Sequence, residues 1–80
     1  MPWTIMQRYK NLSKGSGVTA YDLRSNGIIL QFADASRYLY TYASTGRDHV
    51  QEMKKLAKKG RGLTTYVNQH VGSAYAMRLA

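Results

Sequence analysis

The sequence predicts an α+β domain in which a three-stranded antiparallel β-meander packs against one long and one shorter α-helix. Residues 18–42 are rich in β-forming side chains and are broken by turn residues, whereas apolar residues recur at near-helical spacing after residue 44. Eighty residues suffice for one small domain and are too few for two. We therefore expect a single domain over residues 1–80, with a lead-in at 1–17 whose part from Tyr9 to Gly17 is polar and glycine-bearing.

The meander is expected from strands at 18–23, 28–33 and 37–42. Asn26-Gly27 stands between the first two strands, and this pair tolerates the positive φ angles of a tight hairpin turn. Asp34-Ala35 falls at the second turn. It is a poorer turn than Asp-Gly, because alanine carries a Cβ penalty at positive φ.

Two helices are expected after the meander, at 46–59 and 62–71. Thr45 and Asp48 resemble a capping box at the start of the first helix, and Gly60 suits a left-handed C-terminal residue. The last residues, 75–80, are expected to continue the second helix or to fray. The apolar faces of the two helices are formed by Val50, Met53, Leu56 and Ala57, and by Leu63, Tyr66, Val67, His70, Val71 and Ala74.

Tyr38, Tyr40 and Tyr42 form an aromatic stripe, because residues at a spacing of two share one face of a strand. If the second hairpin has a two-residue loop, the tyrosines face away from Ile28, Leu30 and Phe32 and are open to stack on bases. If the loop is odd in length, they join those three residues on one core face. Amphipathic aromatic residues are common at core edges, which favours burial with the hydroxyls reaching solvent.

Charge indicates a polyanionic partner. Twelve Lys and Arg residues against four Asp and Glu give a net charge of +8, which attracts nucleic acid or other polyanions. Arg47, Lys54 and Lys58 form a stripe without an acidic residue on the first expected helix, and Lys59 and Arg61 follow. The alternative is that these side chains complement the helix dipole and keep a small domain soluble.

Catalytic and metal chemistry have little support in the sequence. There is no cysteine, which fits a reducing compartment, and His49 and His70 lack metal-ligand spacing. The glycine-bearing segments match neither phosphate-binding fingerprint. No window is long and apolar enough to cross a bilayer. We expect a cytoplasmic protein without enzymatic activity, cofactor, metal or membrane association.

A set of residues at characteristic spacing runs from about Ser16 to Val71. It consists of Tyr21-Asp22, Phe32, Tyr38-Leu39-Tyr40, Gly60 and Gly62-Leu63-Thr64-Thr65-Tyr66-Val67. In this order the signals resemble the KTSC domain, which is named for the C-terminal extension of some lysyl-tRNA synthetases and also occurs as small free-standing bacterial proteins. The sequence departs from that pattern at Asp34-Ala35, where relatives commonly carry Asn-Gly, and at Thr64, where Asn is expected. The resemblance implies the fold, and the attachment to a synthetase suggests RNA binding.

The sequence thus favours a non-catalytic module that binds RNA or another nucleic acid. The alternative is a protein-interaction or assembly module, in which the tyrosines belong to the core or to a subunit interface such as that of a homodimer. Basic and aromatic patches that lie side by side favour RNA, and patches on opposite sides favour the alternative. The expected nucleic-acid-binding residues are Tyr38, Tyr40, Tyr42, Arg37, Arg47, Lys54, Lys58, Lys59 and Arg61.

Overall fold

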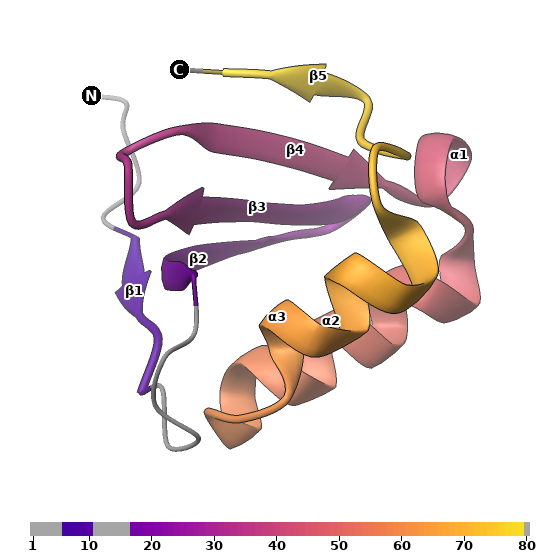
Figure 1. The fold of residues 1–80 in the computed structure, drawn as a ribbon. Coiled ribbons are helices and arrows are strands. Elements are labelled where there is room, and N and C mark those ends of the chain that lie inside the picture. Colours follow the sequence, from indigo (N-terminus) through magenta and orange to yellow (C-terminus); the bar gives the residue numbers. More distant parts are fainter. Residues whose placement is uncertain (1–5, 11–16, 80) are drawn as a thin grey trace.

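A computed structural model describes residues 6–10 and 17–79, in which one antiparallel sheet carries helices on one side (Figure 1). The strand order is β1-β2-β3-β4-β5, so each strand pairs with its neighbours in sequence. The strands are β1 (Gln7–Arg8), β2 (Val18–Arg24), β3 (Gly27–Phe32), β4 (Arg37–Thr41) and β5 (Met77–Arg78). The helices are α1 (Tyr42–Thr45), α2 (Arg47–Lys59) and α3 (Leu63–Tyr66), and α3 runs into a π-helical turn, η1 (Val67–Val71).

The α+β class and the antiparallel sheet are confirmed, but the expected number of three strands is wrong. The two additional strands, β1 and β5, lie at the sheet edges and have two residues each, too few to show a periodicity. β1 falls in the expected lead-in, and β5 falls in the segment expected to continue a helix or fray. Each is held by pairing with the neighbouring strand: Tyr9 N–H donates to Thr19 O, and Leu79 N–H donates to Arg37 O.

The hairpin of β3 and β4 places the tyrosines on the core face. Tyr40 lies opposite Ile28 and Tyr38 lies opposite Leu30, so these four side chains share one side of the sheet. Phe32 N–H donates to Ser36 O, which leaves a loop of three residues from 33 to 35. The odd loop is therefore the alternative that forms, and the arrangement expected from a two-residue loop does not.

The core lies between this sheet face and the helices. Its fully buried side chains come from β2, β3, α2 and α3, and they include Ile28, Leu30, Met53 and Leu63. Tyr9 joins them at 3 % exposure, and its hydroxyl accepts a hydrogen bond from Leu63 N–H at 3.2 Å. An aromatic residue in the expected lead-in thus ties the first strand to α3.

The start of α2 differs from the sequence expectation. Thr41 and Ser44 form the capping box, at the N-terminus of α1, and α2 begins after Gly46, which has no side-chain cap. Thr45 instead donates its hydroxyl to Ala74 O at 2.8 Å. The expected box at Thr45 and Asp48 is wrong because Tyr42 leaves the strand and opens the extra turn α1.

The C-terminal end of α2 and the extent of α3 and η1 agree better with the positions predicted from the sequence. Gly60 ends α2 in the left-handed conformation, with φ 87° and its N–H bonded to Leu56 O. Leu63, Val67 and Val71 are buried on the inner face of α3 and η1, whereas His70 is exposed. The π-helical turn closes with a hydrogen bond from Gly72 N–H to Val67 O at 2.7 Å.

Gly27→Ala should destabilise the fold, because β3 and β4 approach closely at this residue. A Cβ at Gly27 would collide with the carbonyl oxygen of Tyr40 and lie 3.0 Å from Thr41 Cα. We expect a loss of about 2 kcal/mol in the free energy of unfolding, measured by urea denaturation. Gly17→Ala is the matched control, since its Cβ would make ordinary contacts of 3.7 Å or more. Equal stability of both variants would contradict the close approach.

Ala35→Gly should stabilise the fold. Ala35 has φ 71°, a conformation that costs an L-residue with a Cβ, and among the described residues it is the only non-glycine with positive φ. Glycine has greater freedom in the unfolded chain, which offsets part of the stabilisation. We therefore expect the free energy of unfolding to rise by about 0.5–1 kcal/mol, measured by urea denaturation. Ala33→Gly lies in the same turn without positive φ, and it should lower stability instead.

Candidate nucleic-acid interface

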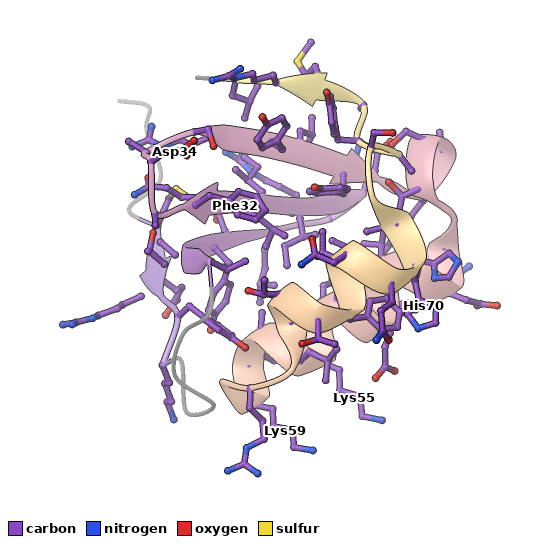
Figure 2. The ribbon with its side chains drawn as sticks, viewed as in Figure 1. Phe32, Asp34, Lys55, Lys59 and His70 are labelled. Carbon is purple, nitrogen blue, oxygen red and sulfur yellow. The ribbon has the colours of Figure 1, made fainter. Side chains whose placement is uncertain are left out.

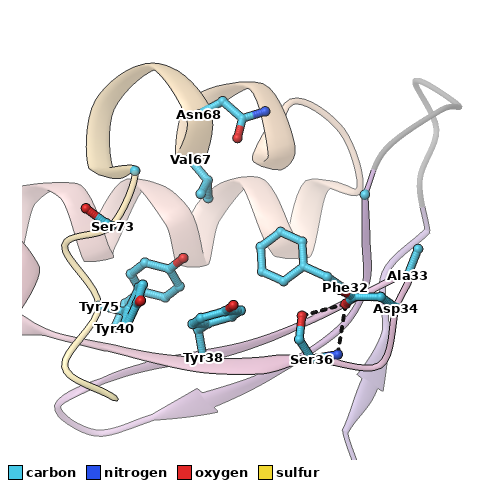
Figure 3. A pocket seen from close by; sticks show the side chains of 12 residues that line it. Phe32, Ala33, Asp34, Ser36, Tyr38, Tyr40, Val67, Asn68, Ser73 and Tyr75 are labelled. Carbon is cyan, nitrogen blue, oxygen red and sulfur yellow. Dashed lines mark hydrogen bonds between the residues drawn. The ribbon is translucent and has the colours of Figure 1, made fainter. Parts of the chain in front are cut away.

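An open groove of about 520 Å³ lies between η1 and the hairpin of β3 and β4 (Figure 3). Aromatic side chains form its floor, and Val67 and Asn68 of η1 stand across from them. Asp34 and Ser36 lie at one end and Ser73 lies toward the other. The floor consists of Phe32, Tyr38, Tyr40 and Tyr75.

The floor is a connected set of rings. The centroids of Tyr38 and Tyr75 are 4.6 Å apart, and Phe32 meets Tyr38 edge-on at 5.8 Å. Tyr38 is half-buried and Tyr75 is 36 % exposed, whereas Tyr40 is only 2 % exposed beneath them. Arg78 lies over the Tyr38 ring, with its Cζ 5.7 Å from the centroid. Tyr38 and Tyr75 therefore present the aromatic surface that a planar ligand could stack on.

Burial changes the chemistry of the deepest tyrosine. Loss of solvation, and then the neighbouring Tyr38 and Tyr75, raise the pKa of Tyr40 to about 12. Its hydroxyl therefore stays protonated at neutral pH and keeps its ability to donate a hydrogen bond.

The end of the groove carries a fixed carboxylate. Asp34 Oδ1 accepts hydrogen bonds from the Ser36 hydroxyl at 2.6 Å and from Ser36 N–H at 3.0 Å. These bonds lower the pKa of Asp34, so its side chain is charged at neutral pH. The three-residue turn thus places one negative charge beside the aromatic floor.

Tyr42 lies outside the groove. Its hydroxyl accepts hydrogen bonds from Gln51 Nε2 at 2.7 Å and from Lys54 Nζ at 3.1 Å. Lys54 also donates to Arg24 O at 2.6 Å, and Arg47 lies 5.9 Å from the centre of the Tyr42 ring. Three of the expected binding residues, Tyr42, Arg47 and Lys54, therefore meet in a separate cluster, and Lys54 is held by structural contacts.

The other basic residues of the expected site lie elsewhere. Arg37 is on the face of the sheet opposite the tyrosines, where its Nε donates to Gln31 Oε1 at 2.8 Å. Lys58, Lys59 and Arg61 are exposed at the C-terminal end of α2. Figure 2 shows Lys55 and Lys59 pointing away from the sheet. The fold thus brings only Tyr38 and Tyr40 of the expected residues into the groove.

Sequence reasoning missed Phe32, Asp34, Tyr75 and Arg78 as site residues. Tyr75 and Arg78 follow the last helical turn, in a segment without a clear period, and they reach Tyr38 only because β5 pairs with β4. Phe32 and Asp34 flank a turn whose length decides where they point. The signal for Tyr75 in the sequence was an aromatic residue after the last predicted helix.

The two histidines come together on the outside of the helices. His49 Nδ1 and the Tyr66 hydroxyl are 2.7 Å apart, and the rings of His49 and His70 are 6.1 Å apart. In the part of the chain that the structure describes, no group of three His, Cys, Asp or Glu side chains could hold a metal ion. None of the described helices has the length and apolar character needed to span a bilayer.

Comparisons with protein-family models, with curated proteins and with solved structures found no match to this chain. The similarity to the KTSC domain therefore stays a prediction from the sequence.

Tyr40→Phe should reduce the loss of stability at high pH. The folded-state pKa of Tyr40, about 12, is higher than the ordinary value of 10.0, so its contribution is complete below pH 10 and is lost as the pH rises toward 12. The free energy of unfolding, measured by urea denaturation between pH 8 and about 12, should fall less steeply in Tyr40→Phe than in the parent. Parallel profiles for the two proteins would contradict the assigned burial of this hydroxyl.

Proposed function

We propose that this protein is a non-catalytic RNA-binding module whose groove takes unstacked bases. The observation that carries the proposal is the open pair of rings, Tyr38 and Tyr75, with the guanidinium of Arg78 beside them. Bases stack on aromatic side chains with about 1–3 kcal/mol per base, whatever their identity. A cation next to the ring adds attraction for the phosphate that accompanies each base.

The shape of the groove favours single-stranded regions. Its aromatic floor lies between the sheet and η1, so a base must be splayed out of a helix before it can reach Tyr38. Bases of loops, bulges and single strands are free to do this, whereas bases in a duplex must first unstack. Single-stranded or structured RNA with exposed bases is the ligand that we propose.

The net charge of +8 supports the same ligand through long-range attraction. Lys58, Lys59 and Arg61 are exposed and lie away from the groove, so their role is to attract the RNA backbone and not to read bases. The resemblance to a synthetase-associated domain agrees with this function. A chain without cysteine fits a reducing compartment, and we propose that the protein acts in the cytoplasm.

A protein-interaction module is the second candidate, and a specific surface favours it. Met77 and Leu79 are 52 % and 42 % exposed at the β5 edge. Met77 pairs with Leu39, which lies on the sheet face opposite the tyrosines. Exposed apolar side chains that gather at a sheet edge are typical of contact surfaces. The separation of the basic end of α2 from the groove agrees with this candidate as well.

Replacing the exposed rings should separate the two candidates. We expect Tyr38→Ala and Tyr75→Ala each to weaken binding of labelled single-stranded RNA about fivefold or more, as measured by fluorescence anisotropy, because each removes a stacking surface. Tyr42→Ala is the matched control, since Tyr42 is a half-buried tyrosine outside the groove. Its RNA affinity should stay within about twofold of the parent, because it offers no stacking surface in the groove.

The binding of duplex DNA and of heparin is measured beside that of single-stranded RNA over a series of salt concentrations. Binding to RNA that outlasts binding to heparin as salt rises supports base stacking. Weak and equal binding to all three, lost at moderate salt and unaffected by Tyr38→Ala, would overturn the RNA proposal in favour of a protein partner.

A further inference from the structure

The lining of the groove is not basic, although the protein has a net charge of +8. The described side chains that line it include no lysine or arginine, and they include the carboxylate of Asp34. A cation, Arg78, lies beside Tyr38, and its charge adds to the hydrogen bonds from Ser36 in lowering the pKa of Asp34. A carboxylate beside the floor repels phosphate, so the interior of the groove suits a neutral planar group that can donate hydrogen bonds. This chemistry matches a nucleobase and not the RNA backbone.

The position of Asp34 decides which edge of a base it would meet. In Figure 3 Tyr38 lies between Tyr75 on one side and Asp34 with Ser36 on the other. A base that stacks on Tyr38 therefore directs one edge toward the carboxylate. Ser36 donates to Oδ1 from both its hydroxyl and its N–H, so Oδ2 is the oxygen that a ligand would meet. The N–H of Asp34 and the charge of Arg78 also favour the ionised carboxylate.

We propose that the groove selects guanine, which stacks on Tyr38 and donates from N1–H and the N2 amino group to the carboxylate of Asp34. This inference rests on the proposed function and adds the identity of the preferred base. An ionised carboxylate only accepts hydrogen bonds, and Oδ2 has two lone pairs, so it can accept both donors of guanine while Oδ1 accepts those of Ser36. Of the four RNA bases, guanine alone presents two adjacent donors on its Watson–Crick edge.

The other bases fit this end of the groove less well. Adenine and cytosine each place an acceptor nitrogen beside their amino group, and uracil places its single N–H between two carbonyl oxygens, so each would set an acceptor against a negative charge. The carboxylate end of the groove therefore favours guanine over the other three bases.

A small organic cation is the alternative ligand, because a carboxylate and aromatic rings together can also bind a cation. The net charge of +8 opposes it, because a cation must approach through a positive field. The same field draws an RNA strand toward the groove, which is why guanine within RNA is the ligand that we infer.

The test uses short labelled oligouridines that carry guanine, inosine, adenine or cytosine at one central position. We expect the parent protein to bind the guanine oligomer about tenfold more tightly than the adenine or cytosine oligomer, in the range that one bidentate contact supplies. Inosine, which lacks the N2 amino group, should fall between them. Affinities are measured by fluorescence anisotropy at one fixed, low salt concentration.

Two variants assign the preference to the carboxylate. Asp34→Asn keeps an oxygen for Ser36 but replaces one acceptor by a donor, so the ratio of guanine to adenine affinity should fall to about one. Ser36→Ala is the matched control: it removes the hydroxyl that binds Asp34 and keeps the carboxylate, so the ratio should persist. Using the ratio cancels the general gain in phosphate affinity that follows from losing a negative charge.

The possible failures are distinct. Equal binding of all four oligomers by the parent protein would overturn the guanine inference and leave RNA binding intact. A guanine preference that Asp34→Asn retains, in a protein that urea denaturation shows to be folded, would overturn the role of Asp34. Failure of the parent to bind any of the oligomers would overturn the proposed function itself.

Discussion

The turn between β3 and β4 is the constraint on which the rest of the structure depends. Side chains alternate across a sheet, so one residue more or less in this loop would move Tyr38 and Tyr40 to the opposite face. Three residues stand between Phe32 and Ser36, and the tyrosines consequently share a face with Ile28 and Leu30. The same turn carries Asp34, whose bonds to Ser36 hold the loop in shape. Core register and groove chemistry therefore come from one short segment.

The return of the chain from η1 to β4 completes the groove. Gly72 ends the helical segment, and the backbone then runs back until Ala76 N–H donates to Leu39 O. Thr45 holds this connection from α1 through its hydrogen bond to Ala74 O. Because of this path, Tyr75 packs against Tyr38 and Tyr40 instead of extending into solvent. Pairing of a two-residue edge strand thus supplies half of the exposed aromatic surface.

The sequence predicts the strands and helices that have a repeating pattern of apolar residues, but it does not predict the short elements that form through one tertiary contact. Apolar residues that recur along β2, β3 and α2 determine the positions of these elements, and Gly60 determines where α2 ends. β1 and β5 cannot be predicted from such patterns, because a strand of two residues shows no period, and β5 pairs with β4 across all of the intervening helices. The same limit affects the site. Tyr38 could be identified as a candidate from its spacing, but its neighbours Tyr75 and Asp34 come from a tail and a turn whose geometry is set by tertiary contacts.

The exposed basic residues of α2 and the groove occupy different parts of this small molecule, and Arg78 is the cation that lies beside the aromatic floor. The exposed lysines at the end of α2 stay where water solvates them, and Lys54 is drawn into hydrogen bonds with Arg24 O and Tyr42. The groove, in contrast, is aromatic and carries one carboxylate. A basic surface attracts any polyanion, because Coulomb attraction does not distinguish one base from another. Discrimination must come from directed hydrogen bonds at short range, and in this fold the groove at the β3–β4 turn joins a stacking surface to a fixed acceptor. In the function that we propose, the two parts divide the work: the net charge concentrates RNA near the protein, and the groove selects the base that remains bound.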